Sequence, residues 1–100
     1  MTKADMVDII SEATGLTKVE TETVISGFLE KMKEALRQGE RIEFRGFGSF
    51  SVKKRKPKKA RNPGTGETIY LPERYVPVFK ASDILKDEVN STLSEAENEQ

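Results

Sequence analysis

Residues 53–61 have the sequence Lys-Lys-Arg-Lys-Pro-Lys-Lys-Ala-Arg, and the turn sequence Asn62-Pro63-Gly64-Thr65-Gly66 follows directly. Seven of the nine residues in the first segment are positively charged. A strand with this charge density cannot enter a core, because an unpaired buried cation has a large desolvation cost. The segment and its turn therefore predict an exposed β-ribbon, and the polyanion that the ribbon best fits is nucleic acid.

The chain after the turn predicts the second strand of this ribbon. Thr68-Ile69-Tyr70-Leu71 is the returning strand, which gives a hairpin arm over approximately residues 53–75. At ~3.3 Å per residue the arm would extend ~30 Å. An isolated two-stranded ribbon is marginally stable, so we expect a flexible arm that becomes ordered on its ligand. Pro57 predicts a free edge or a kink, and the rigid, apolar Pro63 at the tip could wedge between base pairs.

Two helices are predicted before the arm. Each begins with a capping box, in which a threonine is followed three residues later by an acid. The helices then end at a glycine. The residues of these signals are Thr2, Asp5 and Gly15 for the first helix, and Thr17, Glu20 and Gly39 for the second. Two helices joined by so few residues predict an αα-hairpin.

Short strands and a last helix complete the predicted order ααβββα. Ile42 and Phe44 alternate with polar residues and predict a short strand, and Val76-Pro77-Val78-Phe79 predicts the third. Ser82 can cap a last helix with apolar residues Ile84, Leu85 and Val89. Residues 91–100 are polar and acidic, so we expect a disordered tail in which Glu95, Glu97 and Glu99 are solvated.

Composition limits the kinds of protein that fit. One hundred residues suit one domain, but the 35% hydrophobic content is below the usual ~45–50%. Without cysteine or histidine the chain has no disulfide and lacks the commonest acid/base and metal-ligating side chain. We therefore expect no enzyme, no cofactor and no metal site. No apolar run approaches the ~18 residues of a membrane span, which predicts a cytoplasmic protein without a membrane partner.

The wide apolar stripe of the second helix predicts a dimer. Together with the β segment, it offers more apolar surface than one first helix and one short last helix can cover. A second chain would complete the core. We expect the aromatic residues to lie in the core and at the dimer interface rather than to form a platform for base stacking; they are Phe44, Phe47, Phe50 and Phe79.

Charge is distributed unevenly along a chain whose net charge is zero. Residues 1–50 contain 7 basic and 9 acidic side chains, and residues 51–90 contain 10 and 5. Residues 91–100 contain three glutamates and no base. The concentration of positive charge around the arm is typical of nucleic-acid binding, which the net charge alone would not indicate.

The motifs around the arm resemble one known family. Gly46-Phe47-Gly48-Ser49-Phe50, Arg61-Asn62-Pro63-Gly64-Thr65-Gly66-Glu67, Val76-Pro77-Val78-Phe79-Lys80 and Leu85-Lys86 are similar to the bacterial HU/integration host factor family of histone-like proteins, over residues 1–90. The resemblance implies an α+β fold. It also implies an intertwined dimer with a helical body, a three-stranded β-saddle and two extended β-ribbon arms.

The same resemblance implies an architectural function. Members of the family hold duplex DNA in the minor groove with their arms, and the tip proline intercalates and bends the duplex. We expect a nucleoid-associated protein that helps to compact DNA. Arg61, Asn62 and the intercalating Pro63 match the arm tip. The full set of expected DNA contacts is Lys3, Arg45, Lys53, Lys54, Arg55, Lys56, Lys58, Lys59, Arg61, Asn62, Pro63, Arg74, Lys80 and Lys86.

Three alternatives stay open from the residues. Basic arms also suit structured RNA, whose A-form minor groove is wide and shallow. A module that binds an acidic protein partner is an alternative from a different class of function. The chain can also be a site-specific subunit of the integration host factor type, and the sequence does not distinguish a homodimer from a heterodimer with a sibling subunit.

Overall fold

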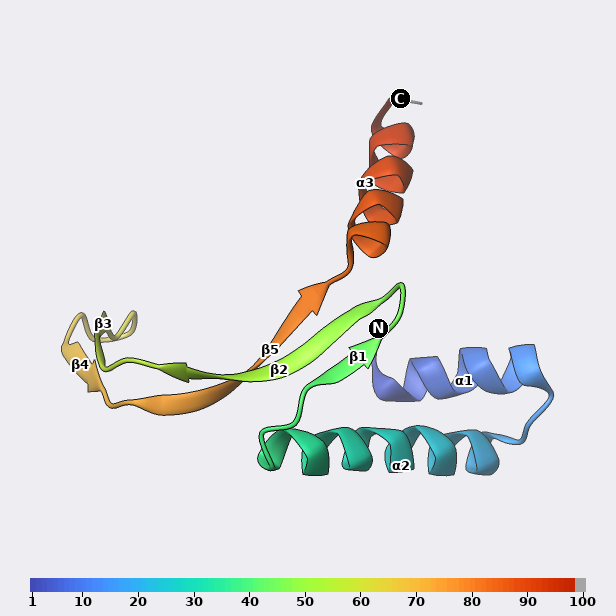
Figure 1. Cartoon of the computed structure of the whole chain (residues 1–100). Helices are drawn as coiled ribbons and strands as arrows, with labels where there is room; N and C mark the ends of the chain where they lie inside the picture. The colour runs from blue at the N-terminus through green and yellow to red at the C-terminus, as the bar shows by residue number, and fades with distance from the viewer. Residues whose placement is uncertain (99–100) are drawn as a thin grey trace.

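The computed structural model describes residues 1–98, which form an α+β fold as predicted. Its longest dimension is 51 Å. The helical hairpin lies at one side, the arm extends away from it, and the last helix leaves the opposite end of the sheet (Figure 1). In chain order the elements are α1 (Lys3–Thr14), α2 (Lys18–Arg37), β1 (Ile42–Phe44), β2 (Gly48–Arg55), β3 (Lys58–Arg61), β4 (Thr68–Leu71), β5 (Arg74–Ala81) and α3 (Asp83–Asn98).

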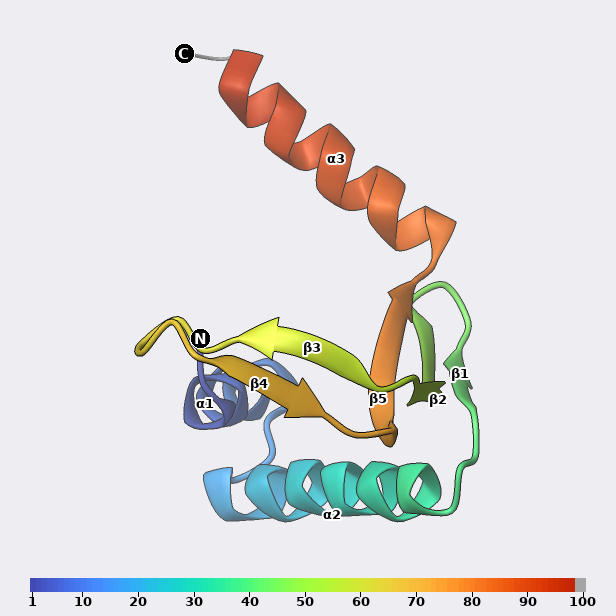
Figure 2. The same ribbon diagram turned by 90° about the vertical axis from the view of Figure 1, so that its left-hand side faces the viewer.

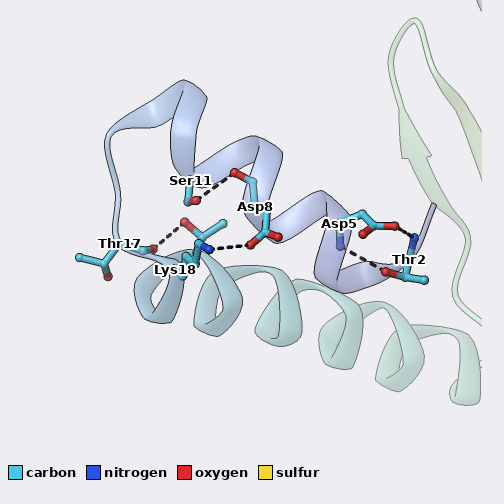
Figure 3. Close-up of polar contacts among 7 residues, drawn as sticks. Thr2, Asp5, Asp8, Ser11, Thr17 and Lys18 are labelled. Atoms are coloured by element: carbon cyan, nitrogen blue, oxygen red, sulfur yellow. Dashed lines mark hydrogen bonds and ion pairs between the residues drawn. The ribbon is translucent and has the colours of Figure 1, made fainter.

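Both predicted capping boxes are confirmed. The Asp5 amide donates to Thr2 Oγ1 at 3.2 Å, and the Thr2 amide donates to Asp5 Oδ2 at 2.8 Å (Figure 3). Thr17 and Glu20 repeat this exchange at the start of α2. Hydrogen bonds from Thr17 lower the pKa of Glu20, so its carboxylate stays charged at the positive end of the helix dipole. Lys18 Nζ lies 3.4 Å from Asp8 Oδ1 and links the two helices of the hairpin (Figure 3).

The strands form a three-stranded sheet and a separate two-stranded ribbon. The sheet is antiparallel with the order β1-β2-β5, as predicted for the saddle, and β3 pairs with β4 in the outer arm. The predicted order with three strands is wrong in number, because each long strand of the arm is divided in two. Pro57 follows β2 and Pro72 follows β4, and a proline cannot donate a hydrogen bond to the ladder.

Aromatic side chains connect the sheet to α2. Phe44 lies between Phe28 of α2 and Phe50 of β2, with ring centroids 5.6 and 6.2 Å away. Phe50 stacks on Phe79 at 4.8 Å, and Phe47 stacks on the same ring at 5.3 Å. The predicted phenylalanines thus pack on one another within the chain, but Phe47 and Phe79 keep 47% and 41% of their surface exposed, and their role at a dimer interface stays a prediction.

The core of the single chain is thin. Val7 is the buried hydrophobic side chain within residues 1–98, beside the buried Ser11 and Thr21. The accessible surface is 8479 Å², whereas a compact monomer of this mass exposes about 5,700 Å². The radius of gyration is 18.8 Å, compared with about 13 Å for a compact domain of this length. The chain therefore leaves much of its apolar surface uncovered.

The expected disorder of the acidic tail is wrong for residues 91–98. Helix α3 continues to Asn98, because Leu93 extends the apolar stripe of Leu85 and Val89 by one more turn and no glycine or proline intervenes. Glu99, the last tail residue with an expected role, lies outside the described residues. The predicted cap is confirmed, since Ser82 Oγ accepts from the Leu85 amide at 3.1 Å. Both views show α3 pointing away from the sheet (Figures 1 and 2).

Candidate nucleic-acid interface

The register of β2 and β5 sorts their side chains onto two different faces. Facing residues share a side of the sheet and neighbours along a strand alternate. The basic face consists of Ser49, Ser51, Lys53 and Arg55 of β2 with Arg74, Val76, Val78 and Lys80 of β5. The apolar face consists of Phe50, Val52 and Lys54 with Tyr75, Pro77 and Phe79. The apolar face is turned toward α2, since Phe50 contacts Phe44, which contacts Phe28.

Four of the predicted DNA contacts meet on the basic face: Lys53, Arg55, Arg74 and Lys80. Arg55 lies directly opposite Arg74, and two like charges in facing positions destabilise a strand pair. The Nη1 atom of Arg74 is buried and has no hydrogen-bond partner among the described residues. An anion at this position would separate the two charges and accept hydrogen bonds from both guanidinium groups.

Lys54 differs from its neighbours because it lies on the apolar face. Its Nζ is 2.6 Å from Glu73 Oε1 and 5.8 Å from the ring centroid of Tyr75. The side chain is therefore held across the strands by an ion pair and a cation–π contact. The structure does not bring Lys54 together with Lys53 and Arg55.

The outer arm carries charge on one of its two strands. Lys58, Lys59 and Arg61 of β3 are exposed, and the residues facing them on β4 are Leu71, Tyr70 and Thr68, which are uncharged. Lys56 lies between β2 and β3 and is also exposed. The basic side chains thus follow one edge of the ribbon from the sheet to the tip.

Hydrogen bonds hold the turn at the arm tip. The Asn62 amide donates to the Glu67 carbonyl, and the Gly66 amide donates to the Asn62 carbonyl, both at 2.8 Å. Asn62 Oδ1 accepts from the Gly64 amide at 2.9 Å. Gly66 has φ of +74°, which favours glycine. Within this turn the Asn62 side chain fixes the chain around Pro63, which is exposed in the turn at the tip of the arm.

The predicted contacts in the body are spread over three places. Arg45, in the turn between β1 and β2, lines a hollow together with Lys80. Lys3 is the first residue of α1, and Lys86 lies in the first turn of α3. Arg41 lines the same hollow as Arg45 and is absent from the predicted set. The sequence could have indicated Arg41 as a contact, because Arg41 and Arg45 alternate with the inward-facing Ile42 and Phe44.

Within residues 1–98, no cluster of three histidine, cysteine, aspartate or glutamate side chains has the arrangement of a metal site. In the same residues, no helix is both long and apolar enough to cross a membrane.

Comparisons with known proteins agree with this arrangement. Integration host factor subunit beta of Hahella chejuensis is 47% identical over 94 residues, which cover 93% of this chain and 96% of the relative. DNA-binding protein HU of Thermus thermophilus is 43% identical over 89 residues, covering 89% and 92%.

Solved structures give the same result. An Anabaena HU–DNA cocrystal structure superimposes with a TM-score of 0.79 at 35% identity, covering 89% of this chain and 97% of that one. HU from Thermotoga maritima gives 0.65 at 28% identity, with coverage of 89% and 98%. Residues 1–90 match the family described as bacterial DNA-binding protein. The chain therefore belongs to the bacterial DNA-binding protein family that contains HU and the subunits of integration host factor.

Proposed function

We propose that this non-enzymatic family member acts in the cytoplasmic nucleoid as an architectural protein, in which a dimer holds duplex DNA between two arms and bends it. The observation that carries the proposal is the segregation of side chains by the β2–β5 register. Lys53, Arg55, Arg74 and Lys80 share one face, and the basic edge of the arm continues from it to Pro63. The opposite face is apolar and is available for a second chain.

The uncovered apolar surface supports the dimer. A groove of about 610 Å³ separates the end of α2 from the apolar face, and Leu36, Val52 and Pro77 contribute to its lining. Tyr75, which also lines it, is 70% exposed. Insertion of apolar side chains from a partner would fill this groove and complete the core that Val7 alone does not provide.

Melting should depend on protein concentration, because a subunit with so thin a core folds together with its partner. From the usual unfolding enthalpy per residue, the melting temperature of a 200-residue dimer should rise by about 3–4 °C for each ten-fold increase in concentration. Differential scanning calorimetry at several concentrations measures this shift. A melting temperature that is independent of concentration, with a monomer mass in solution, would contradict the dimer.

The width of the arm explains why binding and bending are linked. A two-stranded ribbon with its side chains is wider than the ~6 Å minor groove of B-form DNA. Entry of the arm must therefore widen the groove, and bending the duplex away from the arm does this. The contacts that bending adds offset its elastic cost, which is lowest at flexible base steps.

Affinity for duplexes of different flexibility tests the function. Nicked and pre-bent DNA should bind more tightly than an intact duplex of the same sequence, because part of the bending cost has already been met. Duplex RNA should bind less tightly than any of them. Titrations at two salt concentrations provide the comparison. Equal affinities for the three DNA forms would contradict bending, and a preference for duplex RNA would favour the RNA-binding alternative.

A further inference from the structure

The hydrogen-bonded ladder of the arm is interrupted at the same position on both strands. Arg55 pairs with Arg74 at the end of the inner ladder, and Lys58 pairs with Leu71 at the start of the outer one. Two unpaired residues separate these positions on each strand, residues 56–57 on one and 72–73 on the other. Because the numbers are equal, the register continues unchanged across the interruption. Two prolines, Pro57 and Pro72, therefore occupy facing positions.

Hydrogen bonds at the inner end of the ladder show what this position requires. In an antiparallel ladder, facing pairs that exchange two hydrogen bonds alternate with pairs that exchange none. The Ser82 amide donates to the Phe47 carbonyl at 2.9 Å, one residue beyond the pair Gly48–Ala81. The odd-numbered residues of β2 are therefore the hydrogen-bonded ones. Continued outward in the same phase, the next bonded pair after Arg55 would be Pro57 with its facing proline.

Neither proline can make the bonds of that pair, because neither has an N–H group. Among residues 1–98, no backbone hydrogen bond joins residues 56–57 to residues 72–73. Beyond the interruption, the alternation of bonded and unbonded pairs is shifted by one residue. The Asn62 amide donates to the Glu67 carbonyl next to the pair Arg61–Thr68, so the even-numbered residues of β3 are the bonded ones.

The hydrogen-bonded positions thus change from odd-numbered to even-numbered residues although the register stays the same. This change requires the ribbon to turn about its long axis between the two ladders. Figures 1 and 2 show that β3 and β4 leave the direction of β2 and β5 at this level. The interruption also divides the basic residues of the arm. Lys53, Arg55 and Arg74 remain on the inner ladder, and residues 58–61 together with the tip lie on the outer one.

We propose that Pro57 and Pro72 form a hinge that lets the outer arm reorient on DNA while the inner ladder stays fixed to the body. The two prolines are positioning residues, since they act through the outer basic side chains and Pro63. This inference rests on the proposed function, because the motion serves closure of the arm on a duplex. Two adjacent hydrogen bonds are absent, so reorientation at this level breaks no ladder bond.

Restoring both N–H groups tests the hinge without changing any charge. In the double variant Pro57→Ala/Pro72→Ala, the inner ladder can continue through the interruption. Hydrogen exchange of the new amides should be about ten-fold slower than in an unstructured peptide. NMR relaxation should show the outer arm moving together with β2 and β5. The preference for pre-bent over intact duplex should fall about ten-fold, because the restored bonds oppose reorientation, with an unchanged salt dependence.

The control is Thr68→Ala. Thr68 is an exposed residue of β4 that lies outside the dimer groove and the predicted DNA contacts, and its replacement removes no charge and leaves both prolines in place. Arm exchange and DNA bending should equal those of the original protein. If the double variant unfolds, each single variant, Pro57→Ala or Pro72→Ala, should give part of the same change.

Two results would overturn the hinge: fast exchange and an unchanged bending preference in a folded Pro57→Ala/Pro72→Ala protein, or the same loss of bending preference in Thr68→Ala. Failure of the proposed function has a different signature. In that case the original protein does not bend DNA, whereas exchange and relaxation of the free arm still show whether residues 56–57 and 72–73 form a hinge.

Discussion

Replacing Lys58 and Lys59 together by alanine is expected to make the salt dependence of DNA binding much less steep. A dimer loses four positive charges from its two outer arms. If each charge neutralises one phosphate, the slope of log affinity against log salt concentration becomes less negative by up to about 3.6, or about 0.9 per phosphate. Affinity should fall for all DNA sequences alike, most strongly at low salt. Titrations by fluorescence anisotropy at four or more salt concentrations measure the slope.

The control removes the same number of charges from the body. Lys18 and Lys31 are exposed on α2 and form ion pairs with Asp8 and Glu34. The variant Lys18→Ala/Lys31→Ala should keep the original slope. An unaltered slope for Lys58→Ala/Lys59→Ala would mean that the outer arm does not contact the DNA backbone.

Replacing Pro63 by alanine is expected to separate bending from binding. Pro63 is uncharged, so its loss hardly changes the attraction to phosphates. As a wedge it stabilises an unstacked base step, which otherwise costs a few kcal/mol. The bend, measured by energy transfer between the ends of a labelled duplex, should fall sharply. The preference for nicked over intact duplex should fall about ten-fold or more, because a few kcal/mol of differential binding is lost.

The hydrogen bonds of the turn allow a second comparison. Asn62 Oδ1 holds the Gly64 amide, so Asn62→Ala loosens the turn and keeps the proline. This change should weaken binding to straight and bent duplexes in parallel. Full bending by Pro63→Ala at saturating protein would remove the wedge from the mechanism and leave Pro63 as a turn residue.

The local signals in the sequence predicted the fold well. Thr2, Thr17 and Ser82 cap helices as expected, because a cap needs a hydroxyl and an amide only three residues apart. The positions of the short strands and the turn around Pro63 also follow from short patterns, whereas the three-stranded sheet was implied by the family resemblance. Such features depend on neighbours in the chain, which the sequence contains completely.

Features that depend on pairing between distant residues could not be predicted in the same way. Lys54 is one of seven cations within residues 53–61, and only the register with Tyr75 places it on the apolar face. The facing of Pro57 and Pro72 depends on the register in the same way. The helix through residue 98 was not predicted, because the tail is acidic and contains Leu93 as its one large apolar residue, a composition typical of disorder.

The direction of α3 has a consequence for the complex as a whole. The arms carry the positive charge toward the duplex, whereas α3, with Asp83, Asp87, Glu88, Glu95 and Glu97 against Lys86, points away from the sheet. The net charge of the chain is zero. In the proposed complex, a coated duplex therefore keeps the total charge of bare DNA, and acidic helices face outward. We therefore expect neighbouring coated segments to repel one another, so that the proposed bending shortens DNA by changing its path and not by making duplexes adhere.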